Sequence, residues 1–585
     1  MPEQDLENAP AVRASCSTGA LAWRRGFLIV GSGLIGFVAS CGVARPMAVD
    51  GFDLFDQIFA AVSLLLFSWI SFGFLSALAG LASMIVNRGP AASEGQALPK
   101  QPVAVLIPIF NEDVDALGAR ITRMLHSLDR LHATQLFDLF VLSDSRASAE
   151  AAERAMCGSL QSLRDSRIFY RRRPHNEGRK PGNIAEWITR FGAGYEAMII
   201  LDADSLMSGA AMARLAVALE ADPALALIQT TPYLIGGRTL FARWQQFAAA
   251  LYGPVASAGL AWWSGDEATF WGHNAIVRVR AFAESCGLPL LSGPEPFGGI
   301  IQSHDMVEAT LLRRRGWRTR MMLTAEGSYE EPPPTLVDHG LRDRRWCQGN
   351  LQHLRLLDIA GLHWVGRLQL LMGASAYLTS PLWLLLLVMG LAQALRMGTP
   401  MADMGTPAWL VGLTVVLLFG TRVVGLAGAM LDPALVRSLG GWRSILLGAA
   451  IDLPMSIIVA PIIMASQCLA IGAIVAGRPS GWQAQRRDTD GISLGEGFDH
   501  YRWHMLLGLA FWTMSLSELG GAAWSLPVAL GLLGAPFVAA VTSRADLGAA
   551  AQRLGIFAGD PVLDGGEALL RTRSRPWSRA VPSTS

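Results

Sequence analysis

The feature that most constrains the fold of this chain is a set of long apolar runs on both sides of a polar stretch. A helix needs roughly 20 apolar residues to cross the ~30 Å hydrocarbon core of a bilayer. Residues 26–44 and 58–86 form such runs, and more follow after about residue 365. Only 16% of the residues are Asp, Glu, Lys or Arg, below the roughly 25% of soluble domains. The sequence therefore predicts a membrane protein and disfavours an ordinary soluble enzyme.

The runs predict six to eight membrane spans. The first run has no small-x-small cleavage site after it, and a second run follows at once, so it is interpreted as a true span. Asp452, Pro454 and Pro461 interrupt the run at residues 445–475, which is too long for one span and short for two. That run is predicted to be an interfacial or broken helix. The later runs cover residues 370–395, 409–430, 445–475, 506–519 and 522–541.

Loop charge predicts the orientation. Nearly all Lys and Arg residues lie in alternate loops, together with the polar stretch and the two ends. By the positive-inside rule, the termini and the polar domain are cytoplasmic and the number of spans is even. The predicted arrangement is a disordered tail (1–22), two spans (23–86), a soluble domain (87–365), spans and interfacial helices (366–476), a cytoplasmic loop (477–503), two more spans (504–542) and a cytoplasmic tail (543–585).

Charge and cysteine content exclude several classes of protein. A formal net charge of +1 provides no global field for holding nucleic acid. The six Cys residues lie far apart without a Cys-x-x-Cys pair, which excludes a disulfide framework and a zinc ribbon. There is no Gly-x-x-x-x-Gly-Lys-Ser/Thr loop, so an ordinary ATPase function is also disfavoured.

The polar domain is predicted to have an α/β fold with parallel strands. Three short apolar runs, at residues 103–110, 137–142 and 197–201, each end in polar residues, with helical patterns between them. Ligands of open α/β sheets bind beyond the carboxyl ends of the strands. The strand ends carry Asn111, Glu112, Asp144, Asp202 and Asp204, which are therefore predicted to share one crevice. The alternative is that each simply forms a turn after its strand.

Asp202-Ala203-Asp204 is the sharpest of these signals. In an extended segment, positions i and i+2 face the same side, so both carboxylates can face one divalent cation. Magnesium or manganese held there would neutralise a departing diphosphate. A lone Asp-x-Asp is common, and its place directly after an apolar strand is what favours the metal-site interpretation.

Three later segments supply further candidates. His273 lies in FWGHNAIVR, without a second His or Cys at ligand spacing, so core or acceptor-site packing is favoured over metal binding. Asp305 begins a helix after Ser303, where it either complements the helix dipole or acts chemically. Arg345-Trp346 precedes the returning spans, where it either orients the protein on lipid or binds a diphosphate and stacks on a sugar.

The order of these elements resembles the processive family 2 glycosyltransferases, which include the cellulose, chitin and hyaluronan synthases. Four strings are similar to the glucans biosynthesis glucosyltransferase H branch, whose members build osmoregulated periplasmic glucans in Gram-negative bacteria. These strings are RRPHNEGRKPGN (172–183), WGHN (271–274), SHD (303–305) and YEEPPP (329–334).

The resemblance implies a cytosolic GT-A domain inserted between transmembrane helices of the inner membrane. It also implies UDP-glucose as donor, a Mg²⁺ or Mn²⁺ cofactor, and a growing glucan with a β-1,2-linked backbone that leaves through the protein's own spans. Branch members are encoded with a periplasmic protein that trims or branches the glucan.

The resemblance also assigns roles to residues. Asp305 matches the catalytic base, and Asp202 and Asp204 match the metal and diphosphate pair. The base motif reads Ser-His-Asp where cellulose synthases have Thr-Glu-Asp, and Arg342 replaces the Gln of Gln-x-x-Arg-Trp. The implied donor residues are Asn111, Glu112, Asp144, Lys180, Asp202, Asp204 and Arg345; the acceptor residues are Trp271, His273 and Trp346; and Trp482 and Arg486 lie on a loop predicted to gate the donor site.

Two alternatives stay open at this point. One is a synthase of another β-linked polysaccharide, such as cellulose or hyaluronan. The other is a transporter with a nucleotide-sugar-sensing domain, which the intramembrane Arg422 and Asp452 favour and the lack of a visible inverted repeat disfavours.

Overall fold

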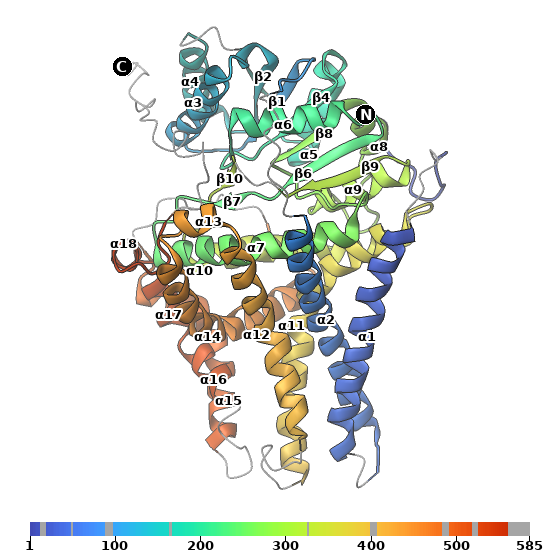
Figure 1. Ribbon diagram of the computed structural model, residues 1–585, viewed down its shortest axis with the longest axis vertical. Helices are drawn as coiled ribbons and strands as arrows, with labels where there is room; N and C mark the ends of the chain where they lie inside the picture. The colour runs from blue at the N-terminus through green and yellow to red at the C-terminus, as the bar shows by residue number, and fades with distance from the viewer. Residues whose placement is uncertain are drawn as a thin grey trace.

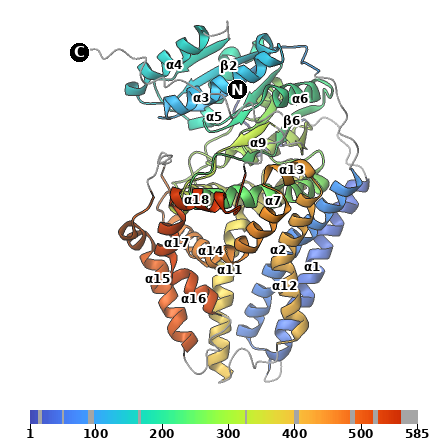
Figure 2. The same ribbon diagram turned by 60° about the vertical axis from the view of Figure 1, so that its left-hand side comes forward.

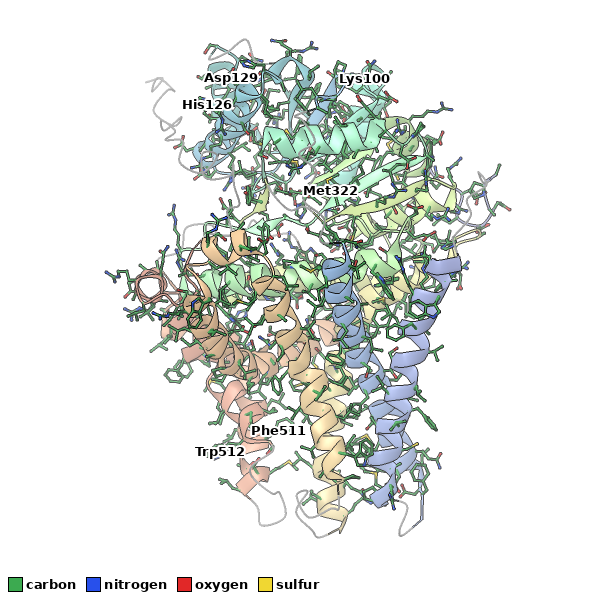
Figure 3. The ribbon with its side chains drawn as sticks, in the orientation of Figure 1. Lys100, His126, Asp129, Met322, Phe511 and Trp512 are labelled. Carbon is green, nitrogen blue, oxygen red and sulfur yellow. The ribbon has the colours of Figure 1, made fainter. Side chains whose placement is uncertain are left out.

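The computed structural model describes two layers, an α/β domain above a bundle of long helices (Figure 1). Side chains of the α/β domain include the charged Lys100 and Asp129, whereas Phe511 and Trp512 lie near the opposite end of the molecule (Figure 3). The described residues are 1–11, 19–47, 51–87, 97–162, 167–323, 327–397, 406–481, 491–516 and 525–559.

A seven-stranded mixed sheet forms the centre of the α/β domain, in the order β3-β2-β1-β4-β8-β6-β9. The first four strands in this order, β3, β2, β1 and β4, run parallel to one another, and β8 is antiparallel to both β4 and β6. The three strands predicted from the sequence are thus confirmed as adjacent parallel strands. The strands are β1 (Val103–Ile109), β2 (Phe137–Ser143), β3 (Ile168–Arg172), β4 (Ala197–Ile200), β6 (Leu225–Thr230), β8 (Ala275–Arg278) and β9 (Arg318–Met322).

Helices cover both faces of this sheet. The central strands β1 and β2 are buried almost without interruption, as expected for a sheet enclosed on both sides. One core cluster packs strand side chains against α3 and α6, and the other packs the opposite face against α5, α8 and α9. The helices of this domain are α3 (Val114–Arg130), α4 (Glu150–Ser162), α5 (Arg179–Phe191), α6 (Gly209–Glu220), α8 (Val279–Ser285) and α9 (His304–Arg314).

A small second sheet lies between the main sheet and the bundle. It consists of β5 (Leu206–Met207), β10 (Ser328–Glu330) and β7 (Tyr233–Leu234), in the order β5-β10-β7. The helices α7 (Leu240–Ser264) and α10 (Leu336–Gln352) lie next to it, across the top of the bundle (Figures 1 and 2). The α/β domain therefore rests on a layer of helices at the junction with the bundle.

Five of the described helices are long and apolar enough to cross a membrane. They are α1 (Gly19–Met47), α2 (Leu54–Val86), α11 (Trp364–Met397), α12 (Ala408–Met430) and α14 (Trp442–Val475). The last predicted spans appear as α15 (Leu494–Leu516) and a pair of short helices, α16 (Leu526–Leu533) and α17 (Ala535–Thr542). Among the described residues, the predicted loop at 477–503 is therefore wrong from Leu494 onward, because α15 begins there.

Helix α14 is continuous, so the prediction of a broken helix is wrong, although Pro454 and Pro461 lie inside it. Both of its ends lie at the junction. Near its start, Ser444 approaches Gly555, and just after its end the backbone N–H of Ser480 donates to Gln348 of α10 at 2.7 Å. Its length would suffice for a span, but these contacts favour the interfacial interpretation.

Close backbone contact joins α7 to the bundle. A Cβ atom added to Gly80 of α2 would lie 2.2 Å from the carbonyl oxygen of Val255, and one added to Gly259 of α7 would lie 2.2 Å from that of Ser76. Small residues at these crossings let the two helices approach each other, as in membrane helix pairs.

Asp452, which is only 1% exposed, makes a second connection between α7 and the bundle. It accepts hydrogen bonds from Trp244 Nε1 at 2.6 Å and Tyr252 Oη at 2.7 Å, both on α7, and it pairs with Arg422 of α12. A buried carboxylate satisfied in this way is a structural connection. Arg422 and Asp452 therefore join α12 and α14 to α7.

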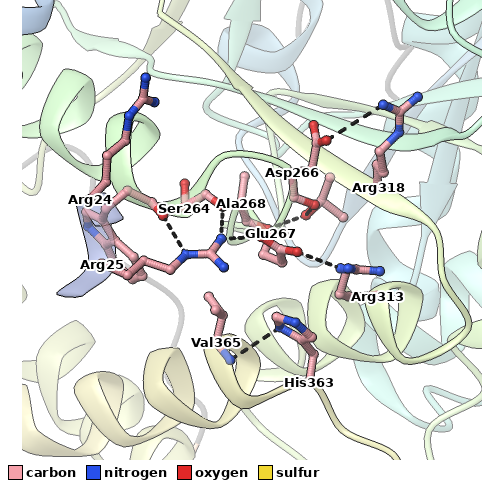
Figure 4. A network of polar contacts seen from close by, with 12 residues as sticks. Arg24, Arg25, Ser264, Asp266, Glu267, Ala268, Arg313, Arg318, His363 and Val365 are labelled. Carbon is pink, nitrogen blue, oxygen red and sulfur yellow. Dashed lines mark hydrogen bonds and ion pairs between the residues drawn. The ribbon is translucent and has the colours of Figure 1, made fainter. Parts of the chain in front are cut away.

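Arg25 of α1, Glu267 after α7 and Arg313 of α9 form a third connection, buried in the junction (Figure 4). Glu267 pairs with Arg25 and accepts from Arg313 Nε at 2.9 Å, while its backbone carbonyl accepts from Gln369 Nε2 of α11 at 2.7 Å. The helix that carries Asp305 is thereby fixed to two helices of the bundle.

The predicted disorder of residues 1–22 is wrong for residues 1–11, which lie against the C-terminal end of α9. The buried guanidinium of Arg314 donates to the carbonyl oxygens of Asp5 and Asn8 at 2.8 and 2.6 Å. The Gln4 backbone N–H donates to the Gly287 carbonyl at 2.8 Å. A polar segment can be ordered without its own core when a folded surface supplies hydrogen bonds for its backbone.

Part of the predicted C-terminal tail (543–585) is folded. Helix α18 (Ala545–Arg553) packs on α7, and the Phe557 carbonyl accepts from Arg243 Nη1 at 3.2 Å. Residues 560–585 lie outside the described part of the chain.

Candidate active site

The predicted strand-end residues lie at one edge of the main sheet. Asn111 follows β1, Asp144 follows β2 and Asp202 follows β4, and β1 lies between the other two strands. Neighbouring strands are ~4.8 Å apart, so Asp144 and Asp202 are separated by about 10 Å across the sheet. Asn111 has a φ of 53°, and its side chain accepts from the Arg146 backbone N–H at 3.0 Å. Glu112 is half-buried beside it.

Asp144 is held by Arg173, which the sequence did not single out. Both carboxylate oxygens accept from this guanidinium, at 2.6 and 2.7 Å, and both side chains are nearly buried. Arg173 also donates to the Glu177 and Arg179 carbonyls at 2.9 and 3.1 Å, which fixes the turn that leads into α5. Gly182 is required in this turn, because a Cβ there would lie 2.1 Å from the Glu177 carbonyl oxygen.

This turn brings Lys180 to Asp202. Its Nζ pairs with Asp202 and donates to the Gly272 carbonyl at 2.8 Å. Burial opposes the charge on Asp202, but Lys180, together with His273, outweighs it and lowers the pKa of that carboxyl to about 2. Asp202 is therefore ionised at neutral pH and available as a metal ligand.

Asp305 lies on the other side of Gly272. A Cβ added to this glycine, whose φ is +84°, would lie 3.4 Å from Asp305 Oδ2. Lys180 pairs with Asp202 and donates to the Gly272 carbonyl. It thus links Asp202, at the end of its strand, to the segment around Gly272 that lies next to Asp305. The structure brings together the predicted metal pair and the predicted base, which come from widely separated parts of the chain.

Asp204 follows in the same loop as Asp202 and is half-buried. The loop is supported from behind, because Arg120 Nη1 donates to the Ala203 carbonyl at 3.0 Å and pairs with Glu331 at 2.6 Å. Among the described residues, no group of three or more His, Cys, Asp or Glu side chains is arranged to hold a metal ion. Two carboxylates still fit Mg²⁺, which commonly takes one or two protein carboxylates plus substrate phosphates.

His273 pairs with Glu330, a residue of the YEEPPP string. Its Nε2 lies 3.3 Å from Glu330 Oε2. Burial disfavours the charged imidazole, but Asp202 and Glu330 outweigh this effect and raise the pKa of His273. Trp271 is half-buried next to it, and its backbone N–H donates to Gln229 at 2.9 Å.

The Arg-x-x-Arg-Trp motif reaches the same site from α10. A Cβ on Gly349 of this helix would lie 2.5 Å from the Ser303 backbone nitrogen, so α10 packs directly on the start of α9. Burial, together with the charges of Arg342 and Arg179, lowers the pKa of Arg345, while Asp202 opposes that effect. Trp346 is 45% exposed, and the Arg342 guanidinium lies 4.3 Å from the centre of its ring.

Comparisons with known proteins show which family the chain belongs to. The models for glycosyl transferase family 2 and for glycosyl transferase family group 2 match residues 104–285 and 197–424. A glucans biosynthesis glucosyltransferase H from Rhodopseudomonas palustris (strain ATCC BAA-98 / CGA009) is 40% identical over 93% of this chain and 78% of its own length. The chain belongs to the glucans biosynthesis glucosyltransferase H family.

Two further members of the family and one solved structure are also similar to this chain. The enzyme of the same name from Caulobacter vibrioides (strain NA1000 / CB15N) is 40% identical over 93% of this chain and 88% of its own. That from Xylella fastidiosa (strain 9a5c) is 38% identical over 95% and 91%. A mannosyltransferase from Pyrobaculum calidifontis, solved with GDP-Man and Mn²⁺, covers 65% of this chain and 100% of its own with 16% identity and a TM-score of 0.39.

Within this glucosyltransferase H family member, sequence reasoning missed the partners of the predicted residues. Arg173, Glu330, Glu308 and Arg120 all contact or flank the predicted site residues. Arg173 and Glu330 lie in strings that carry the family resemblance, which was the available signal. The predicted gating residues Trp482 and Arg486 lie outside the described residues.

Proposed function

We propose that this glucosyltransferase polymerises glucose from UDP-glucose into a β-1,2-linked glucan backbone, processively and with inversion, and passes the glucan across the inner membrane. The observation that carries the proposal is the chain of contacts from Asp202 through Lys180 and the Gly272 carbonyl to Asp305. These contacts bring the carboxylate pair that suits a cation, Asp202 and Asp204, together with a third carboxylate. That third carboxylate, Asp305, is not part of the salt bridge between Asp202 and Lys180.

The donor side would hold the diphosphate. Asp204 and Asp202 would hold a Mg²⁺ or Mn²⁺ ion, which supplies Lewis-acid stabilisation of the leaving group when bound. Arg345 and Lys180 supply fixed positive charge on the same side, and Asp144 with Arg173 borders the nucleotide side of the sheet edge. We assign Asn111 and Glu112 to the same donor region, because they follow the strand between Asp144 and Asp202.

The acceptor side would hold the growing glucan. Asp305 accepts the proton of an acceptor hydroxyl while that oxygen forms a bond to the anomeric carbon. The bond from that carbon to UDP breaks, and its electron pair leaves with the diphosphate. One displacement converts an α-linked donor into a β-glycoside. Trp271, His273 and the exposed ring of Trp346 would contact the sugar end of the acceptor.

The site's position suits export of the product. α10 lies at the junction between the α/β domain and the bundle, next to α11 and α14 (Figure 1). A polymer extended at Trp346 would therefore begin where the α/β domain meets the helix bundle. We place the α/β domain on the cytoplasmic side of the inner membrane, where UDP-glucose is made, and expect a periplasmic glucan-processing protein to receive the product.

Turnover by the purified chain tests this proposal. In lipid nanodiscs with UDP-glucose and Mg²⁺, we expect release of UDP, loss of that release with a chelator, and a product with 1,2-linkages. GDP-mannose is the matched donor control and should give no release. A 1,4-linked product would instead establish a cellulose-like synthase, and no release of UDP at all would contradict the transferase function.

A further inference from the structure

A buried charge pair occupies the first turns of α9, directly beside the proposed base. His304 Nδ1 lies 3.0 Å from Glu308 Oε1, and the two side chains are 11% and 2% exposed. His304 fills the position at which the base motif departs from that of the cellulose synthases. Neither residue has a part in the proposed mechanism above.

Helix electrostatics do not explain a cation at this position. The N-terminus of a helix favours negative side chains and disfavours positive ones. A buried imidazole would also be expected to stay neutral, because burial disfavours its charged form. Glu308 outweighs that burial, with help from Asp305, and raises the pKa of His304.

The groups around the pair come from several elements. Lys180 of α5 opposes the charge on His304, whereas Asp202 of the metal pair interacts with it favourably. Burial raises the pKa of Glu308, and His304 opposes this effect. The remaining titratable neighbours are Cys286, whose Sγ approaches the Glu308 carbonyl at 3.6 Å, and His353, whose Nε2 lies 2.8 Å from the Ser303 carbonyl.

We propose that His304 and Glu308 are a positioning pair in which Glu308 holds a positively charged imidazole next to Asp305 at the start of α9. This fixed charge balances the Asp305 carboxylate and the incoming diphosphate, and it keeps Asp305 oriented as a base. The proposal rests on the proposed glucosyl transfer and adds two residues and a charge requirement to it.

The pH dependence of transfer tests the pair. As pH rises through the raised pKa of His304, the imidazole loses its proton, so kcat/KM for UDP-glucose in the wild type should fall. This decrease at high pH is the falling limb of the pH profile. In His304→Gln we expect kcat to be lower by about tenfold at neutral pH, with this falling limb absent. In Glu308→Gln the imidazole loses its partner, so the falling limb should move to lower pH.

His353→Gln is the matched control, because it removes a buried histidine that also contacts the start of α9. Burial lowers the pKa of His353, so this residue is neutral where the limb falls. Its removal should leave the position of the limb unchanged. Thermal unfolding midpoints of all variants, measured alongside, separate loss of fold from loss of charge.

The double variant completes the test. If the pair acts as a unit, His304→Gln/Glu308→Gln should be no slower than His304→Gln alone. A falling limb at the same pH in the wild type and in Glu308→Gln would overturn the proposal, even if His304→Gln failed to fold. No UDP release by the wild type at any pH would instead refute the transferase function on which the pair depends.

Discussion

Asp305→Asn is expected to leave UDP-glucose affinity nearly unchanged and to lower the rate of glucosyl transfer about a hundredfold or more. The amide has almost the same shape as the carboxyl, so the contact with Gly272 and the start of α9 should persist. It cannot accept the proton of the acceptor hydroxyl at neutral pH, and no other carboxylate of the site is free for this role in the proposed mechanism.

Two measurements on the same preparation check this expectation. Titration with UDP-glucose should give a dissociation constant close to that of the wild type, and UDP release should be slow. Asp222→Asn is the matched control, since it makes the same chemical change at a partly exposed pair with Arg318 and Arg320. Wild-type turnover by Asp305→Asn would dismiss the base assignment.

Glu267→Gln is expected to destabilise the protein by about 3–5 kcal/mol. Glu267 is 4% exposed and is the carboxylate shared by the buried guanidiniums of Arg25 and Arg313 (Figure 4). Removing its charge leaves two buried cations without compensation, where the junction between α1, α9 and α11 is formed. The thermal unfolding midpoint, followed by tryptophan fluorescence, measures the effect.

The neighbouring Asp266 provides the control for Glu267. Its carboxyl pairs with Arg320 at 2.7 Å, but the two side chains are 34% and 43% exposed. An exposed pair contributes less than about 1 kcal/mol, so Asp266→Asn should change the midpoint little. Equal effects of the two substitutions would show that burial of the Glu267 network does not matter to stability.

The strand-end residues of the site could be predicted because their signals are local. β1, β2 and β4 are short and mostly apolar, and each is followed closely by a polar residue of the site. Parallel strands bring their carboxyl ends to one edge, so Asp144 and Asp202 could be placed together from the sequence. The partner of Asp144 could not, because Arg173 reaches it through a turn whose path depends on Gly178 and Gly182, and Lys180 was named only through the family resemblance.

The junction was the hardest part to predict. α7 is apolar and 25 residues long, yet nothing in its composition distinguishes a helix lying on the bundle from one inside a soluble core. The order of residues 1–11 depends on the Arg314 guanidinium, more than 300 positions away in the sequence. Long-range contacts of this kind leave no periodic pattern in the chain.

An experimental structure of the protein in nanodiscs with UDP and Mn²⁺ tests the central claim most directly. The account predicts a manganese ion against Asp204 and Asp202, the diphosphate beside Lys180 and Arg345, and the Asp305 carboxylate facing the open side of the same crevice. A nucleotide bound elsewhere on the chain, or an ion held away from both Asp202 and Asp204, would contradict it.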